Sequence, residues 1–274
     1  MFRLPIIYTC FPGGKHKVLT MSYDDGRRED YRLVELFNRH GIKGTFNLNA
    51  GIDWDGRRIP QSEYRTLYEG HEIACHTFTH PTVARSPLDQ VAQQVLADRR
   101  GLEQLIGRPV RGLAYPNGSY SKEIISMLPS LGIKHARIVP TTGSFAMPEN
   151  YLAWAGTCHH NDHLMDHARA FAELNKSQYL YMMYVWGHSY EFTNNDNWHV
   201  MEAFCQFIGG RDDIWYASNI EIVDYLEDAA RLQYTAAGDC VYNPNAQSIW
   251  IRVDLPGQEL KVFEIPGGQL IKLI

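Results

Sequence analysis

The chain has 274 residues, of which 45% are hydrophobic and 21% are charged, and its formal net charge at pH 7 is -5. This length and hydrophobic content are sufficient for one large globular domain, or for one domain with an appendage, and they exclude a disordered chain. The negative net charge and the lack of basic runs argue against nucleic acid as a partner. The five cysteines are scattered and include no C-x-x-C pair, which argues against a disulfide framework and a thiolate zinc site.

Signals for export and for membrane insertion are missing from the sequence. The segment Met1–Cys10 carries one basic residue and a short apolar stretch that Pro5 interrupts, which is too little for a secretory signal. The longest apolar run, Tyr179–Trp186, is too short to cross a bilayer. We therefore expect a cytoplasmic protein without a membrane partner, provided that no leader has been removed. No pattern in the sequence indicates the oligomeric state.

Strand-like and helix-like segments alternate along the chain, as is typical of a parallel sheet covered by helices. The seven expected strands are Lys17–Tyr23, Lys43–Asn49, His71–Cys75, Val110–Tyr115, Lys134–Val139, Tyr179–Trp186 and Asp213–Ala217. The expected helices are Glu29–His40, Ser62–Tyr68, Ser86–Ile106, Lys122–Leu128, Leu164–Leu174, Trp198–Ile208 and Ile220–Gln233. Within the third helix, Ser86 and Asp89 have the spacing of a capping box.

Seven strand–helix units predict an α/β fold, a (β/α)7 barrel that is one unit short of the common eight. We place this barrel at residues 1–234. After Gln233 the helical pattern stops, and residues 235–274 show short strand-like runs separated by proline and glycine. These residues predict a small β-rich C-terminal appendage.

Two neighbouring carboxylates, Asp24 and Asp25, end the first expected strand. Adjacent residues of a strand point to opposite sides, so one carboxylate can bind a cation while the other accepts a proton. Further along, the segment His76–His80 has a histidine at each end. Two histidines and a carboxylate can hold a metal with coordination positions left open for water and substrate. Each motif alone also suits an ordinary turn or a pair of buried imidazoles, so their joint occurrence carries the prediction of a catalytic centre.

Two further motifs follow other expected strands. The turn Tyr115–Gly118, which contains Asn117, ends the fourth strand, and His188 follows the sixth. Barrel enzymes carry their chemistry at the C-terminal ends of the strands, so we expect both motifs beside the metal ligands. Pro81 disfavours helix at His80, which places the histidine pair on a loop.

In type, spacing and order, these motifs resemble those of the polysaccharide deacetylase family, the carbohydrate esterases that include chitin and peptidoglycan deacetylases. The resemblance spans residues 15–233 and is carried by Ser22–Gly26, His76–His80, Tyr115–Gly118 and the strand that ends at His188. It implies a distorted (β/α)7 barrel that removes acetyl groups from an N-acetylated or O-acetylated sugar or polysaccharide. It also implies a divalent metal cofactor, with Zn²⁺ as the first choice and other divalent transition metals as alternatives.

The resemblance also implies roles for individual residues. Asp24 matches the general base of the family, and His188 matches the general acid. The metal ligands implied by the resemblance are Asp25, His76 and His80.

This sequence departs from the family at one position. The family usually carries an arginine two residues before the proline that matches Pro116, and this chain has Ala114 there. That arginine steadies the base carboxylate. Either another cation reaches Asp24 in its place, or burial alone tunes that carboxylate. The cations considered are Arg27, Arg111 and Arg137.

The chemistry of these residue types fits amide hydrolysis. A divalent metal lowers the pKa of a bound water to about 7, so a carboxylate such as Asp24 can take its proton. The backbone N–H of Asn117 is the expected donor to the oxyanion. The leaving amine needs a proton, which His188 can supply if Glu191 raises its pKa.

Aromatic side chains near the motifs offer faces on which sugar rings stack. The expected substrate-lining residues are Tyr115, Trp154, Trp186 and Glu191. The cluster Cys158–His163 is open to three interpretations. It lines the cleft, it binds a second ion, or it is a solvated loop in which Asn161 or Asp162 caps the following helix.

Three other functions compete with a sugar deacetylase. A non-haem iron oxygenase shares the ligand set, but such enzymes are expected on all-β folds. A related metal-dependent amidohydrolase that acts on a cyclic amide or ureide would use the same residues. A non-catalytic carbohydrate-binding homologue is disfavoured by the presence of both Asp24 and His188.

Overall fold

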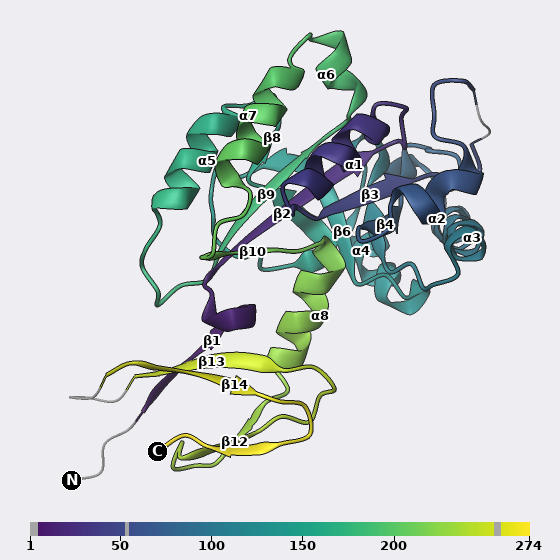
Figure 1. The fold of residues 1–274 in the computed structure, drawn as a ribbon. Coiled ribbons are helices and arrows are strands. Elements are labelled where there is room, and N and C mark those ends of the chain that lie inside the picture. The colour runs from purple at the N-terminus through teal and green to yellow at the C-terminus, as the bar shows by residue number, and fades with distance from the viewer. Residues whose placement is uncertain (1–4, 53–54, 255–258) are drawn as a thin grey trace.

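A barrel of parallel strands with helices around it forms the larger part of the molecule, and a β-rich layer lies at one end (Figure 1). The structure is a computed structural model that describes residues 5–52, 55–254 and 259–274. The first residues of the segment Met1–Cys10, which is not expected to be a signal, lie outside this range. None of the helices described has the length and hydrophobicity that crossing a membrane requires.

Six strands of the barrel coincide with expected ones. They are β2 (Lys17–Asp24), β3 (Gly44–Leu48), β4 (Glu72–Cys75), β5 (Gly112–Ala114), β6 (His135–Thr141) and β9 (Tyr181–Gly187). Hydrogen bonds join them in the order β6-β5-β4-β3-β2-β9, and every pair is parallel. All residues of β2 are buried, because helices cover the outside of the barrel and side chains fill its interior.

The segment 154–159 closes the barrel, and the sequence analysis did not recognise it as a strand. Its first half, β7 (Trp154–Gly156), pairs with β6, and its second half, β8 (Cys158–His159), pairs with β9. Halves this short give no hydrophobic run for a sequence pattern to reveal. The expected strand Asp213–Ala217 is present as β10 (Ile214–Tyr216), but it pairs with the first residues of β2, outside this ring.

When the segment 154–159 is counted as one strand, the ring has the seven strands that a (β/α)7 barrel requires. The expected fold class is therefore confirmed, although one of its strands was assigned to the wrong segment.

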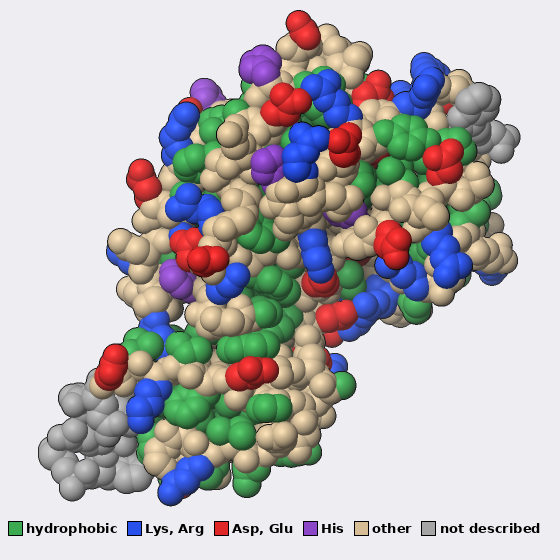
Figure 2. Space-filling model, in the orientation of Figure 1, with side chains coloured by type: hydrophobic (Ala, Val, Ile, Leu, Met, Phe, Trp, Pro, Cys, Tyr) green, Lys and Arg blue, Asp and Glu red, His purple; other side chains and the backbone are tan. Residues whose placement is uncertain are grey.

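On the face shown in Figure 2, acidic and basic side chains are interspersed over the barrel.

The helices are α1 (Asp30–Arg39), α2 (Tyr64–Leu67), α3 (Leu88–Ile106), α4 (Lys122–Met127), α5 (Leu164–Glu173), α6 (Tyr190–Asn194), α7 (Trp198–Ile208) and α8 (Asn219–Ala229). α1, α7 and α5 lie on one side of the barrel, and α2 packs beside α3 on another (Figure 1). The expected capping of α3 by Ser86 is wrong. Pro87, in an extended conformation, occupies the N-cap, and no side chain caps the helix.

The β-rich layer combines both ends of the chain. In one sheet, β13 (Ile249–Asp254) pairs antiparallel with β1 (Ile6–Cys10) and with β14 (Lys261–Ile265). A second sheet contains β11 (Gln233–Tyr234), β12 (Cys240–Tyr242) and β15 (Leu270–Lys272). The hydroxyl of Tyr225 in α8 donates to the carbonyl of Cys10 at 2.7 Å and accepts the backbone N–H of Trp250 at 2.9 Å. This contact ties the layer to the last helix of the barrel.

Candidate active site

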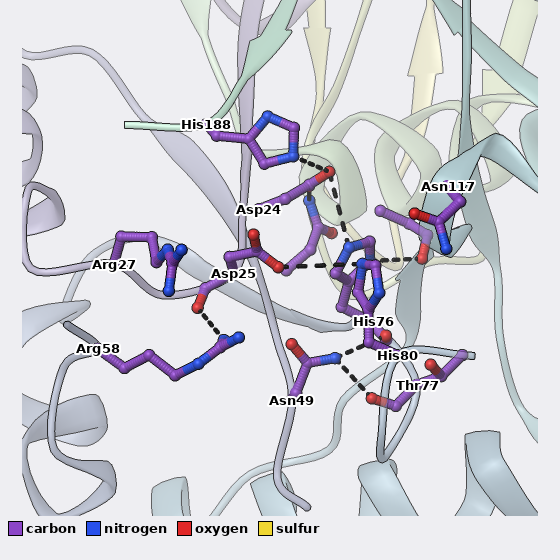
Figure 3. A network of polar contacts seen from close by, with 12 residues as sticks. Asp24, Asp25, Arg27, Asn49, Arg58, His76, Thr77, His80, Asn117 and His188 are labelled. Atoms are coloured by element: carbon purple, nitrogen blue, oxygen red, sulfur yellow. Dashed lines mark hydrogen bonds and ion pairs between the residues drawn. The ribbon is translucent and has the colours of Figure 1, made fainter. Parts of the chain in front are cut away.

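The C-terminal ends of β2, β4 and β9 bring the predicted site residues together (Figure 3). Asp24 is the last residue of β2, Asp25 follows it, and His76 follows β4. His188 comes directly after β9. Parallel strands of a barrel end on one face, so residues that leave the strands at their C-terminal ends converge there.

Asp25, His76 and His80 form a group of three side chains that could hold a metal ion. One ligand atom from each lies within 4.8 Å of the others, and Nε2 of His80 is 4.0 Å from Oδ1 of Asp25. Nδ1 of His76 lies 2.8 Å from the carbonyl oxygen of Ala114. A carbonyl can only accept, so the proton of His76 is on Nδ1, and the lone pair of Nε2 is free for a metal. The donor set and this tautomer fit a divalent transition metal such as Zn²⁺.

The backbone around these ligands is strained. Four non-glycine residues with positive φ lie at the site, namely Asp25 at 78°, Thr77 at 62°, His80 at 58° and Asn117 at 55°. Positive φ is uncommon for such residues, and for the β-branched Thr77 it is an outlier. Strain of this kind persists only where the surroundings over-determine the conformation, and it is concentrated at functional sites.

Asn49, which the sequence analysis missed, holds the strained turn in place. Its Nδ2 donates to the carbonyl oxygens of His76 and Thr77, each at 2.7 Å. The side chain is buried at 2% exposure, so these bonds are not exchanged with water. The sequence feature that could have identified Asn49 is its position, as an asparagine, at the end of an apolar strand.

Asp98 supports the same turn from α3 and was also missed. Its carboxylate accepts the backbone N–H of His76 at 2.9 Å and that of Ala50 at 2.6 Å. Burial outweighs these donors and raises the pKa of Asp98 to about 7. Asp98 lies on the buried face of the helix with Val95 and Leu102. An acidic residue on an otherwise apolar helix face is the sequence feature that could have identified Asp98.

Asp24 is buried between the metal ligands and His188. Its Oδ1 accepts a hydrogen bond from Nδ2 of Asn47 at 2.8 Å. Its Oδ2 lies 3.9 Å from Nε2 of His76 and 3.9 Å from Nε2 of His188. The same oxygen pairs with the guanidinium of Arg137.

Arg137 is thus the cation that replaces the arginine missing at Ala114. The two residues are register partners in β6 and β5. The guanidinium of Arg137 also stacks over Trp186 at 4.4 Å from the ring centroid. The other two arginines considered lie elsewhere: Arg27 stacks on Tyr190, and Arg111 pairs with Asp224.

The charges around Asp24 and His188 shift both pKa values. Burial alone would raise the pKa of Asp24, but Arg137, His76, His188 and the Asn47 hydrogen bond outweigh burial and hold the pKa below its usual value. Burial alone would lower the pKa of His188, but the hydrogen bond to Glu191 and the charges of Asp24 and Asp25 raise it above its usual value. This arrangement favours an ionised carboxylate at Asp24 beside a protonated imidazole at His188.

Asn117 lies in the turn that follows β5, on the far side of His76 and His80 from Asp25 (Figure 3). Its side chain donates from Nδ2 to Oγ1 of Thr82 at 3.2 Å. This bond holds the turn while the backbone adopts its left-handed conformation.

The expected substrate-lining residues lie at different depths. Tyr115 and Trp154 are 1% and 0% exposed, so the structure places them in the core rather than at the mouth of the site. Trp154 packs edge-on against Tyr184 inside the closed barrel. Trp186 is buried beneath Arg137, whereas the side chain of Glu191 is 22% exposed beside His188.

The cluster Cys158–His163 comprises β8 and the turn after it. The expected capping of α5 by Asn161 or Asp162 is not formed, because His163 is the N-cap and no side chain caps the helix. His159 and His160 instead reach Glu191, at 3.1 and 3.0 Å from its Oε2.

The molecule is thus a (β/α)7 barrel that carries a group of possible metal ligands at the C-terminal ends of its strands. The sequence profile described as Polysaccharide deacetylase matches residues 12–136. A chitooligosaccharide deacetylase from Azorhizobium caulinodans is 26% identical over 129 residues, which cover 47% of this chain and 55% of that protein. A peptidoglycan-N-acetylglucosamine deacetylase from Bacillus cereus is 26% identical over 112 residues, which cover 40% of each chain. Residues 12–136, just under half of the chain, thus match the polysaccharide deacetylase family.

Solved structures support the fold. A putative polysaccharide deacetylase from Mycobacterium smegmatis superimposes with a TM-score of 0.60 at 15% sequence identity. The alignment covers 84% of this chain and 96% of that one. At this identity the similarity establishes the barrel, and the chain spans about half or less of the two curated relatives.

Proposed function

We propose that the chain is a metal-dependent hydrolase that removes acetyl groups from an N-acetylated or O-acetylated carbohydrate. The observation that carries this proposal is the position of Asp24. Its Oδ2 lies 3.9 Å from a candidate metal-ligating nitrogen of His76 and 3.9 Å from Nε2 of His188. One carboxylate oxygen therefore lies between a metal site and a proton donor. The family and the printed names of both relatives support the same reaction.

Asp25, His76 and His80 hold the divalent metal in this proposal, with Zn²⁺ as the first candidate. Their two imidazole nitrogens and one carboxylate oxygen leave coordination positions open, as catalytic sites require. The bonded Nδ1 of His76 orients the ring and leaves Nε2 unprotonated toward the site. When bound, such a metal supplies an acidified water and polarises the acyl carbonyl.

The side chains of the protein then move the protons. Asp24, ionised and held by Arg137 and Asn47, accepts a proton from the attacking water. The backbone N–H of Asn117 donates to the oxyanion. His188 gives its Nε2 proton to the leaving nitrogen, so the carbon–nitrogen bond breaks with a neutral amine as the product.

Acetate release from a panel of acetylated sugars tests the proposal. The panel contains N-acetylglucosamine oligomers, peptidoglycan fragments, acetylated xylan and a cyclic amide. Release of acetate that stops on chelation and returns with added Zn²⁺ supports a metal-dependent deacetylase. If the protein opens the cyclic amide and releases no acetate from any sugar, the substrate is a cyclic amide and the proposed carbohydrate substrate is wrong.

A further inference from the structure

A second cluster of histidines lies behind His188 and converges on one carboxylate. Oε1 of Glu191 is 3.2 Å from Nδ1 of His188. Oε2 of Glu191 is 3.1 Å from Nε2 of His159 and 3.0 Å from Nε2 of His160. Three imidazole nitrogens therefore approach the two oxygens of one side chain. Two histidines and a carboxylate are also a metal-ligating composition, so the positions of the protons decide what the cluster does.

The tautomer of His159 identifies its Nε2 as a donor. The backbone N–H of Asn161 donates to Nδ1 of His159 at 3.2 Å. A nitrogen that accepts an N–H carries no proton of its own, so the proton of the neutral ring is on Nε2. His76 shows the opposite arrangement, because its Nδ1 donates to a carbonyl and its Nε2 is free. The tautomer that suits a metal ligand is therefore at His76, whereas the protonated Nε2 of His159 lies 3.1 Å from Oε2 of Glu191.

His160 is fixed in the core by packing. It is 2% exposed, and its ring stacks on Tyr23 at an interplanar angle of 8° and on Phe192 at a centroid distance of 4.1 Å. A Cβ at position 187 would lie 2.1 Å from Nδ1 of His160, so Gly187 is what allows the ring to approach β9. Burial lowers the pKa of His160 to about 4, and the ring is therefore neutral. Among the described residues, neither ring nitrogen of His160 meets hydrogen-bond geometry, and Nε2 is the nitrogen that lies close to Glu191, 3.0 Å from its Oε2.

The pKa of Glu191 reflects the three imidazole rings around its carboxylate. Burial alone would raise the pKa of this carboxyl, but the neighbouring His159, His160 and His188 outweigh burial and hold the pKa well below its usual range. Its Oε1 bonds to His188 and its Oε2 lies against two imidazole rings, so the carboxylate cannot rotate freely. Its Oε1 is consequently kept in place for Nδ1 of His188.

We propose that His159 and His160 are positioning residues. Their Nε2 atoms, 3.1 and 3.0 Å from Oε2, keep Glu191 in place, so that Glu191 retains a proton on Nδ1 of His188 and leaves Nε2 of His188 for proton exchange with the substrate. The proposal rests on the proposed function through His188. During turnover, His188 gives its Nε2 proton to the leaving nitrogen and keeps the Nδ1 proton that Glu191 accepts. Without the two histidines, Glu191 can turn away from Nδ1 of His188, and neutral His188 can then keep its proton on Nε2 instead of Nδ1.

The kinetic test compares two substitutions at each histidine in the metal-loaded protein. His160→Met and His159→Met remove the donor at similar size, whereas His160→Gln and His159→Gln keep an amide N–H near the same place. We expect the methionine variants to lose about 10- to 100-fold in kcat on an N-acetyl sugar with little change in KM. Aryl acetate hydrolysis should fall much less, because a phenolate leaves without a proton. The glutamine variants should recover most of the loss.

One variant serves as a control for these substitutions. His199→Met changes an exposed imidazole on α7 and should leave both reactions unchanged. Equal losses on both substrates, or no recovery by glutamine, would overturn the proposal in favour of a packing role. Loss of a metal equivalent in the methionine variants would show that the cluster binds an ion instead.

A measurement without substrate separates this proposal from the proposed function. Long-range ¹H–¹⁵N spectra of protein labelled at histidine, assigned with the variants above, report which ring nitrogen carries each proton. We expect Nε2–H for His159 and His160 and Nδ1–H for His188. Nδ1–H at His159 or His160 would overturn the proposal. A wild-type protein that shows the expected tautomers but releases no acetate would instead contradict the proposed function.

Discussion

Arg137 forms a buried ion pair with Asp24 across 113 positions of the chain. Arg137 is the register partner of Ala114, the position at which the family usually carries its arginine. Side chains of register partners in neighbouring parallel strands project from the same face of the sheet, so a guanidinium on β6 reaches the carboxylate that one on β5 would reach. The charge at the site is kept, although a different strand supplies it.

Replacing Arg137 should therefore damage both folding and activity. Arg137→Met leaves Asp24 buried without its cation, which costs about 3–5 kcal/mol for a broken buried pair. The pKa of Asp24 should rise, so the acid limb of kcat/KM moves to higher pH. Denaturant unfolding and pH–rate profiles measure these effects. Arg111→Met, which breaks a half-exposed pair with Asp224, is the control and should cost about 1 kcal/mol or less. Adding Ala114→Arg to Arg137→Met should restore part of the activity, and no recovery would contradict the equivalence of the two positions.

His80→Ala should reduce metal content and activity together. Two remaining protein ligands rarely retain zinc tightly. Metal analysis after dialysis, with acetate release measured in parallel, checks this expectation. His199→Ala, at an exposed position on α7, is a matched control that should keep full metal content. Full metal occupancy in the His80→Ala variant would contradict the assignment of His80 as a metal ligand.

Asp24→Asn should separate the base from the metal ligands. The amide keeps the size of the side chain but cannot accept the proton of water, so kcat should fall by about 100-fold or more. Metal content should stay at the wild-type level. If the metal is lost in this variant, Asp24 and Asp25 exchange or share the roles proposed for them.

His188 should set the alkaline limb of the pH profile. The raised pKa of His188 keeps the acid protonated to a higher pH than the usual value of about 6.5. Activity on an amide should then fall as the pH rises through that raised value. His188→Ala should lose about two to four orders of magnitude on an N-acetyl sugar, together with this limb. An alkaline limb that persists unchanged in the variant would assign it to another group.

Asn49→Ala should loosen the strained turn that carries His76 and Thr77. The change removes two hydrogen bonds and leaves buried carbonyls unpaired, which costs about 1–3 kcal/mol for each such group. Metal affinity should fall about 10- to 100-fold, because the turn positions two ligands. Thermal unfolding with and without metal measures both effects. Asn175→Ala, at an exposed position, should change neither, and an unaltered metal affinity in Asn49→Ala would show that the turn holds its shape unaided.

The sequence by itself determined the barrel and the order of the main site motifs. Asp24, Asp25, His76 and His188 each end or follow a strand that its apolar run identifies. In a barrel of parallel strands, such positions must lie on one face, so a local pattern was sufficient to group them.

Other parts of the site were decided by the tertiary structure alone. Arg137 could be chosen from three arginines only once β5 and β6 were in register. Trp154 could not be assigned to the core before β7 and β8 were seen to close the barrel. His159 and His160 looked like loop residues until that closure placed them against Glu191. Local sequence patterns report which residues form a strand and which face of it is apolar, whereas barrel closure decides which side chains from distant strands meet.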